Sequence, residues 1–582
     1  MHAMKQLTMI TALALGMANA AETAAERDER MAWWREAKFG VFIHWGVYAV
    51  PAGIHNGKEV PGIGEWIMLR ARIPVAEYRA YAKEFTASKY DPEALAELIK
   101  EAGARYTVIT SKHHDGFALY PSAVTDWDAA DSSPAGRDLL APLAAAVRQR
   151  DIRFGLYFSQ AQDWVHPGGA KAEMKEGEGW DPAHDGDFDD FLRDIAVPQT
   201  REILLRYQPD ILWWDTPAWM TTERARPLAE LIPLRPGLIT NNRLGGDFPG
   251  DTETPEQFVP ATGFPGRDWE ACMTMNETWG YKSNDQNWKT PAELIQTLVD
   301  CVSKGGNFLL NLGPTPEGEI PAPSIERMKA IGAWMSKNGE AIYGTTASPF
   351  LKLDWGRCTK RLSADGGTLF LHVFEWPADG QLNVPGLRSK ITAASMLDGG
   401  AKLEFATTDA GLRIKLPANK PDPSASVIAV EFTGALTVEQ QLPGPLADGS
   451  IKLPAAIADI HNHVLAQARI DGRGDEARVT GWTRELISVS WDFQAKSPGR
   501  FELTASHSGP DSANKGSLQL GKTQQEIEFP ASPAGQRAST ALGVVEIPEA
   551  GTYRIEIKPK DKNWKPLDLF GLSLKPVPSH VR

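Results

Sequence analysis

The chain has 582 residues, of which 42% are hydrophobic and 23% are charged. These fractions are close to the globular average, which excludes a mainly disordered chain, a collagen-like chain and a long coiled coil. The 61 Lys and Arg residues against 74 Asp and Glu residues give a net charge of −13 with no clustered positive charge, so nucleic acid is not expected as a partner. Three cysteines, Cys272, Cys301 and Cys358, cannot form a disulfide framework.

Residues 1–20 have the pattern of a secretory signal peptide. Lys5 supplies a positive charge, residues 7–17 are mostly apolar, and Ala18-Asn19-Ala20 matches an A-x-A cleavage site. The apolar run is too short to span a bilayer, and no later segment reaches about 18 apolar residues. We therefore expect cleavage near Ala20, export to the periplasm or the extracellular space, and no membrane span.

Residues 21–345 alternate between short apolar strands and longer helical patterns. This alternation predicts βα units and a parallel sheet. Seven or eight such strands fit a (β/α)8 barrel better than an open doubly wound sheet, and no dinucleotide fingerprint or phosphate loop is present. In chain order, strands are predicted over residues 38–43, 105–110, 153–158, 211–214, 238–241, 271–275 and 307–312, and helices over 92–102 (with Asp91 as N-cap), 139–150, 187–207 and 290–304.

After Gly344 the helical periods fade, and short strands alternate with Gly, Pro, Asp and Asn turns. The pattern predicts a β-sandwich over residues 346–436, a linker near residues 443–449, and a second β-rich domain over residues 437–582. Trp482, Trp491 and Trp564 leave two options for this last domain. They could form a carbohydrate-binding face, or they could be buried in a sandwich core.

Polar and aromatic residues follow the predicted barrel strands one after another. In a (β/α)8 barrel the active site lies where the strands end, so these residues are expected to share one rim. Asp215 ends the fourth strand, and a carboxylate-rich loop with Asp251, Glu253 and Glu256 follows the fifth. Each cluster alone could be structural, but all of them together are hard to explain by packing.

Three functions could use such a rim. A metal-dependent hydrolase would take His44, His113 and His114 as ligands, although adjacent histidines on a strand point to opposite faces. A glycosidase needs two carboxylates, aromatic faces and hydroxyl-binding donors, all of which the rim supplies. A non-catalytic glycan-binding protein would keep only the aromatic groove, and the separate carboxylates count against it.

At these residues the sequence resembles the α-L-fucosidases of glycoside hydrolase family 29. The resemblance covers residues 27–345, and the β-sandwich that follows also fits. QAQDW at 160–164 resembles the broad-specificity subfamily. The motifs are HWG (44–46), GEW (64–66), KHHDGF (112–117), WWD (213–215), NNR (241–243), TPEQ (254–257), WE (269–270), WGY (279–281) and SKGGNFLLNLGP (303–314).

The resemblance implies that Asp215 is the nucleophile and Glu256 the acid/base, with Asp251, Glu253 and Glu270 as competitors for the second role. It implies a retaining enzyme that removes terminal α-L-fucosyl residues from fucosylated oligosaccharides or glycoconjugates, with no metal and no organic cofactor. Another barrel glycosidase remains the nearest alternative. The residues that match the fucose pocket are His44, Glu65, Trp66, His113, His114, Tyr157, Trp213, Arg243 and Trp279.

Overall fold

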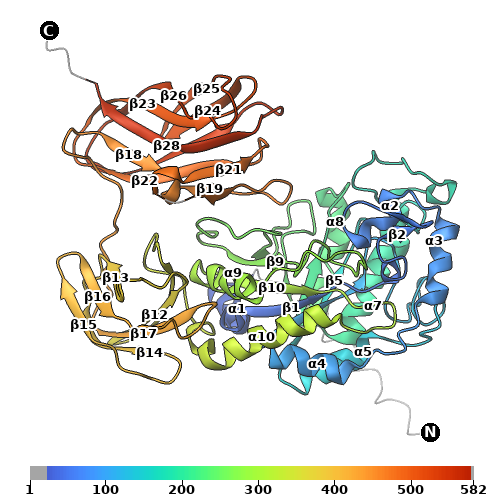
Figure 1. The fold of residues 1–582 in the computed structure, drawn as a ribbon. Helices are drawn as coiled ribbons and strands as arrows, with labels where there is room; N and C mark the ends of the chain where they lie inside the picture. The colour runs from blue at the N-terminus through green and yellow to red at the C-terminus, as the bar shows by residue number, and fades with distance from the viewer. Residues whose placement is uncertain (1–21, 473, 578–582) are drawn as a thin grey trace, which may run out of the picture.

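The computed structural model describes residues 22–472 and 474–577. Figure 1 shows a barrel of strands and helices, a small β-domain beside it, and a second β-domain joined by an extended connection. The predicted signal peptide lies outside the described residues. None of the helices in the described part of the chain is both long and apolar enough to cross a bilayer.

Eight parallel strands form the barrel in the order β7-β6-β5-β4-β1-β10-β9-β8. The two end strands meet where Asn241 and Thr252 form a parallel bridge, and the Asn242 N–H donates to the Thr252 carbonyl at 3.0 Å. The predicted (β/α)8 barrel is confirmed in this form. The strands are β1 (Phe39–Ile43), β4 (Tyr106–Lys112), β5 (Arg153–Phe158), β6 (Ile211–Trp214), β7 (Ile239–Thr240), β8 (Thr252–Glu253), β9 (Asp268–Met273) and β10 (Asn307–Leu312).

Helices cover the outside of the barrel (Figure 1). Asp91 Oδ1 accepts from the N–H groups of Glu93 and Ala94 at 3.0 Å, so it caps α4 as predicted. Residues 241–267, which connect β7, β8 and β9, contain no helix, so these crossovers depart from the regular βα repeat. The barrel helices are α4 (Pro92–Glu101), α5 (Leu140–Arg148), α6 (Phe188–Phe191), the π-helical η5 (Leu192–Ala196), α7 (Val197–Tyr207), α8 (Thr222–Ala229), η6 (Ile232–Leu234), α9 (Pro291–Ser303), α10 (Ala322–Asn338) and η7 (Gly339–Ala341).

Helix α1 (Ala24–Ala37) lies against the end of the barrel where the strands begin. Arg30 donates to both carboxylate oxygens of Asp251, at 2.8 and 3.0 Å, just before β8. Arg27 donates to Asp268 at 2.9 Å at the start of β9. These ion pairs join α1 to the starts of β8 and β9. Neither of these two strands follows a barrel helix.

The long connection after β1 carries short elements near the other end of the barrel. A second insertion, between β5 and α6, contains η4 (Pro182–His184). The elements after β1 are η1 (Val47–Ala49), β2 (Ile54–His55), β3 (Lys58–Glu59), η2 (Gly64–Trp66), α2 (Ile67–Arg70), α3 (Val75–Tyr81) and η3 (Ala82–Glu84).

The next domain packs two antiparallel sheets, ordered β11-β12-β17-β14 and β13-β16-β15. Phe370, Ala425 and Val427 belong to the same buried apolar cluster as the barrel core, so this domain is packed firmly onto the barrel. Its strands are β11 (Gly356–Ser363), β12 (Gly366–Val373), β13 (Gln381–Pro385), β14 (Lys390–Met396), β15 (Phe405–Thr408), β16 (Gly411–Lys415) and β17 (Ser426–Thr433).

The last domain has a core of its own between two further antiparallel sheets. Trp482, Trp491 and Trp564 are all buried in it, so they do not form an exposed binding face. One sheet is β20-β21-β28-β23-β26 with β18 paired to β28, and the other is β19-β22-β27-β24-β25. The elements are β18 (Ile451–Pro454), η8 (Ala455–Ile457), β19 (Asp459–His461), β20 (Arg469–Asp471), η9 (Gly474–Glu476), β21 (Arg478–Trp482), β22 (Ser488–Ala495), β23 (Gly499–Ser508), β24 (Asn514–Leu520), β25 (Thr523–Phe529), β26 (Ala538–Ile547), β27 (Gly551–Pro559) and β28 (Leu567–Pro576).

Candidate active site

The site lies where the barrel strands end. His44 follows β1, His114 follows β4, Asp215 follows β6 and Arg243 lies just after β7, while Tyr157 is the next-to-last residue of β5. Because the carboxyl ends of parallel strands meet at one rim, residues far apart in the sequence come together there. The barrel thus assembles the predicted rim from separate strands.

Asp215 is held in one orientation by groups from three strands. Its Oδ2 accepts from the Tyr157 hydroxyl at 2.8 Å, and its Oδ1 accepts from Nη1 of Arg243 at 2.8 Å. Nε2 of His114 lies 3.5 Å from Oδ2, and the Asp215 N–H donates to Oε1 of Gln160 at 3.1 Å. A carboxylate fixed in this way can present an oxygen to a reacting atom without reorganising.

The surroundings of Asp215 keep it ionised. Burial is the largest single influence and raises its pKa, but several opposing influences, with the positive charge of Arg243 the first among them, together bring the pKa below the ordinary value of 3.8. The hydrogen bonds from Arg243 and Tyr157 act in the same direction. Asp215 is therefore a carboxylate at neutral pH, which is the form that a nucleophile requires.

Glu256 is the second carboxylate of this rim. Its segment runs beside β9, since the Gln257 N–H donates to the Cys272 carbonyl at 2.9 Å. Nη1 of Arg243, which contacts Asp215 at 2.8 Å, also donates to Oε2 of Glu256 at 2.9 Å. Because both oxygens contact one nitrogen atom, they are separated by at most the sum of these distances, about 5.7 Å. A retaining glycosidase requires about 5–5.5 Å between its two carboxyl groups.

The three histidines of the rim are neutral. Burial lowers the pKa of His44 and His114 to about 4, and it lowers the pKa of His113 well below the ordinary value. Nδ1 of His44 lies 2.7 Å from Oδ1 of Asn311, which can only accept, so Nδ1 carries the proton and Nε2 is an acceptor. Neutral imidazoles of this kind can both donate to and accept from the hydroxyl groups of a polar, uncharged ligand.

Aromatic rings form an ordered stack beside Asp215. His113 stacks on Tyr157 with ring centres 5.2 Å apart, and Tyr157 stacks on Trp213 at 5.9 Å. The Arg243 guanidinium lies 4.6 Å from the centre of the Trp213 ring. The stack fixes the Tyr157 hydroxyl and the Arg243 fork, which both contact the Asp215 carboxylate.

Two tryptophans extend this aromatic surface. Trp279 lies 5.1 Å from His44, and Trp66 lies 5.6 Å from His114, measured between ring centres. Trp279 follows β9, and Trp66 belongs to the insertion after β1. Trp279 thus supplies an apolar face beside His44, and Trp66 supplies one beside His114.

Glu65 is buried beside the Trp279 loop. Its Oε2 accepts from the Gly280 N–H at 2.8 Å, and burial raises its pKa to about 7. Its Oε1 and the Nδ1 atom of His113 are buried without a hydrogen-bond partner among the described residues. Both atoms are therefore left with hydrogen-bonding capacity that a polar group could use.

The other candidate carboxylates lie elsewhere. Glu270 is buried inside the barrel, where it accepts from Tyr106 Oη at 2.8 Å and from Trp213 Nε1 at 2.9 Å. Glu253 is paired with Arg267 at 2.8 Å. Asp251 lies at the start of β8, at the opposite end of the barrel from Asp215. The structure thus brings Glu256, and none of these three, to the same guanidinium as Asp215.

Comparison with known proteins decides the family. The family model for α-L-fucosidase matches residues 10–340. The chain belongs to the α-L-fucosidase family. It is 33% identical to the human tissue α-L-fucosidase over 69% of this chain and 89% of that protein, and 34% identical to the mouse enzyme over 69% and 90%. It is therefore an α-L-fucosidase, a glycoside hydrolase whose substrates are glycans.

Solved fucosidases have the same architecture. The α-L-fucosidase of Vibrio sp. strain EJY3 is 27% identical and matches 94% of this chain and 98% of its own, with a TM-score of 0.70. Isoenzyme 1 of Paenibacillus thiaminolyticus is 35% identical and matches 70% and 100%, with a TM-score of 0.62. A Bacteroides thetaiotaomicron enzyme, 30% identical with a TM-score of 0.61 over 70% and 97%, was trapped as a covalent intermediate with 2-fluoro-fucosyl fluoride in a variant with one glutamate changed to glutamine.

One group of side chains at the rim has the spacing of metal ligands. Among the described residues, His113, His114 and Asp215 place possible ligand atoms within 4.8 Å of one another. The sequence suggested His44, His113 and His114 as metal ligands, whereas this group contains Asp215 in place of His44. Arg243 already contacts Asp215 at 2.8 Å, and its positive charge would repel a metal ion there. The donor set therefore fits an ion pair better than a metal centre.

Three positioning residues were not singled out from the sequence. Gln160 accepts from the Asp215 N–H, Asn311 orients His44, and the Thr254 hydroxyl accepts from Nε of Arg243 at 2.9 Å. All three stand inside motifs of the family resemblance. Their roles depend on contacts between strands, which no local pattern reveals.

Proposed function

We propose that this fucosidase is a retaining enzyme in which Asp215 is the nucleophile and Glu256 the acid/base. The observation that carries the proposal is the single Arg243 nitrogen that contacts both carboxylates, because it limits their separation to about 5.7 Å. This limit, which applies to one oxygen of each carboxylate, agrees with the close spacing of a retaining pair better than with the wider spacing of an inverting pair.

In the first step an Asp215 oxygen forms a bond to the anomeric carbon of the fucosyl residue. The bond from that carbon to the leaving oxygen breaks, and Glu256 transfers its proton to this oxygen. In the second step Glu256 takes a proton from water, and the water oxygen displaces Asp215 from the anomeric carbon. Two inversions give net retention, and Glu256 ends protonated, ready for the next turnover.

Sugar recognition falls to the remaining rim residues. Neutral histidines, Glu65 and Arg243 are suited to hydrogen bonds with ring hydroxyls, and the aromatic faces are suited to the apolar methyl side of a 6-deoxy sugar. The proposed pocket residues are His44, Glu65, Trp66, His113, His114, Tyr157, Trp213, Arg243 and Trp279.

Three finer assignments belong to the same proposal. The QAQDW segment at 160–164 supports the broad-specificity subfamily. The signal pattern of residues 1–20 supports export to the periplasm or the extracellular space. The domain limits are 21–345 for the barrel, 346–436 for the β-sandwich and 437–582 for the last domain. No step in this mechanism uses a metal or an organic cofactor.

The test is hydrolysis of a chromogenic α-L-fucoside beside an α-galactoside and a β-glucoside, with the configuration of the first-formed sugar followed by NMR. We expect activity on the fucoside alone and a product that retains the α configuration. Asp215→Ala should abolish turnover, and added azide should yield a fucosyl azide of inverted configuration. An inverted product from the native enzyme, or near-native turnover by the Asp215 variant, would overturn the proposal.

A further inference from the structure

A hairpin of the last domain contacts the segment that holds Glu256. The hairpin, residues 461–468, connects β19 to β20. The Gln467 side-chain amide donates to the Gln257 carbonyl at 2.7 Å. Gln257 has a φ of 63°, which residues other than glycine seldom adopt. The chain therefore turns sharply next to Glu256, and a group from another domain holds the turn.

Hydrogen bonds hold the hairpin closed. His463 and Ala466 exchange both of their backbone hydrogen bonds at 3.0 Å, which leaves a two-residue turn between them. The Asn462 side chain donates to the Ala468 carbonyl at 3.0 Å and accepts from its N–H at 2.8 Å. Nε2 of His461 lies 2.8 Å from the Ser490 hydroxyl. His461 and His463 thus both belong to the hairpin.

Two aliphatic side chains form its tip. Val464 is 38% exposed and Leu465 is 62% exposed. Leu465 is two residues from Gln467, so its Cα lies within about 7 Å of the Cα of Gln467. A hydrogen-bonded turn thus holds an exposed apolar pair close to the acid/base segment.

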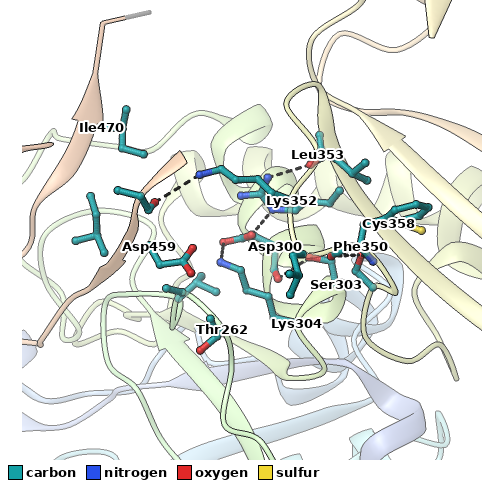
Figure 2. A pocket seen from close by; sticks show the side chains of 18 of the residues that line it. Thr262, Asp300, Ser303, Lys304, Phe350, Lys352, Leu353, Cys358, Asp459 and Ile470 are labelled. Atoms are coloured by element: carbon teal, nitrogen blue, oxygen red, sulfur yellow. Dashed lines mark hydrogen bonds and ion pairs between the residues drawn. The ribbon is translucent and has the colours of Figure 1, made fainter. Parts of the chain in front are cut away.

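A cleft of about 610 Å³ lies between the barrel, the first β-domain and the last domain (Figure 2). Val259 and Thr262, which follow Glu256 in the chain, line it on the barrel side. Asn462, Arg469 and Ile470, at the base of the hairpin, line it on the side of the last domain. The barrel segment that follows Glu256 and the base of the hairpin therefore line one cleft, and neither Glu256 nor the tip of the hairpin is among its lining residues.

The reaction determines which part of the substrate lies near Glu256. Glu256 must reach the oxygen that joins the fucosyl residue to the rest of the glycan, so the leaving sugar lies on the Glu256 side of the site. The Glu256 side chain is 23% exposed and that of Asp215 only 13%, so the site is more open on this side.

We propose that the hairpin of residues 461–468 forms the aglycone wall of the active site. Gln467 fixes it to the Glu256 segment, and Val464 and Leu465 contact the saccharide that leaves. This inference rests on the proposed function, because it takes Glu256 as the acid/base. It assigns the last domain a role in choosing the glycan.

The test compares a fucosyl-galactose disaccharide with an aryl fucoside whose leaving group is small and activated. The double variant Val464→Ser/Leu465→Ser should raise KM for the disaccharide about 3- to 10-fold, as expected for the loss of apolar contact, with kcat/KM for the aryl fucoside within twofold of native. Val544→Ser is a matched control, since Val544 is 41% exposed on β26, at the other edge of the sheet that contains β20.

Gln467→Glu keeps the size of the side chain but removes the amide donor. It should slow the disaccharide several-fold more than the aryl fucoside, whereas Gln519→Glu, which removes a similar exposed bond to Gly521, should change neither. Equal effects on both substrates, or none, would refute the proposal. The proposal would also be refuted if Val464→Ser/Leu465→Ser changed the mass of the enzyme in solution but not its preference between the two substrates. The tip would then be a contact between copies of the chain. Failure of the mechanism itself would appear separately, in the Glu256 variant and in the product configuration.

Discussion

Arg243 controls both carboxylates of the active site. One nitrogen contacts Asp215 and Glu256, and its charge lowers the pKa of Asp215 although burial acts in the opposite direction. The same guanidinium lies over Trp213 and donates to Thr254. Arg243 thus positions both carboxylates and helps to keep Asp215 ionised, although it need not itself form or break a bond.

Glu256→Ala tests the acid/base role. A nitrophenolate leaves without much protonation, so the variant should form the fucosyl intermediate from an aryl fucoside but hydrolyse natural fucosides about 10²–10⁴-fold more slowly. Azide should now yield the fucosyl azide of retained configuration, because it needs no general base. Kinetics of both substrates, with product NMR, provide the measurement.

The alanine variants of Glu270, Glu253 and Asp251 serve as controls for Glu256→Ala. None of them should show a dependence on the leaving group, because none of these side chains contacts Arg243 or Asp215. If Glu256→Ala slowed both substrates equally and azide rescued nothing, the acid/base role would pass to whichever control shows that dependence.

Glu270 affects stability rather than chemistry. Burial raises its pKa from 4.5 to about 7. Between these values the unfolded chain loses the proton while the folded barrel keeps it, so the free energy of unfolding falls as the pH rises. The stabilisation is complete below pH 4.5, and about 3 kcal/mol of it is lost by pH 7 and above.

Glu270→Gln should remove this pH dependence. A neutral amide can still accept from Trp213 Nε1 and donate to Tyr106 Oη, so the fold is kept. Denaturant unfolding of the native enzyme and the variant at pH 5 and pH 8 measures the difference. A variant with an unchanged pH slope, or one without fucosidase activity, would contradict this role for Glu270.

Long elements were predictable from the sequence and the shortest ones were not. The strands over 153–158, 211–214 and 307–312 have the predicted bounds, because buried parallel strands are continuous apolar runs. β8 has two residues, too few for any periodicity, and was missed. Asp251 was therefore placed in a rim loop after the fifth strand, although it directly precedes β8, at the opposite end of the barrel.

The candidate site was predictable in composition but not in geometry. Strand-end residues such as His44 and Asp215 follow from the barrel rule. The shared contact of Asp215 and Glu256 with Arg243 depends on how the helix-free segment after β8 runs beside β9, which sequence patterns do not specify.

The link between α1 and β8 is testable through Asp251. Asp251→Asn removes the charge that Arg30 contacts twice and should lower the free energy of unfolding by about 2 kcal/mol or more. Glu253→Gln, two residues further along the chain, loses a more exposed pair with Arg267 and should cost about 1 kcal/mol or less. Both variants should keep native kcat per folded molecule, since neither side chain contacts Asp215. A selective loss of kcat in Asp251→Asn would contradict a purely structural role.

At the scale of the whole molecule, the chain divides into two bodies with separate apolar cores. The barrel and the first β-domain share one apolar cluster, whereas the buried cluster of the last domain contains residues of that domain alone. The last domain is joined to the other body by hydrogen bonds from Gln467 to the Gln257 carbonyl and from Lys352 to the Ala458 carbonyl, each worth little on its own. Cooperative unfolding follows continuous cores, so the two bodies should melt separately.

Trp564→Ala tests this division. Trp564 is buried in the last domain, with its ring 5.1 Å from Trp482, and its truncation should cost about 3–5 kcal/mol. Calorimetry of the native enzyme should show two transitions, and the variant should lower the Tm of one while leaving the other within about a degree. If a single transition moves as a whole, the domains are energetically coupled. Activity on an aryl fucoside, followed through the first transition to melt, identifies which body unfolds: it should survive loss of the last domain, because every residue that contacts Asp215 belongs to the barrel.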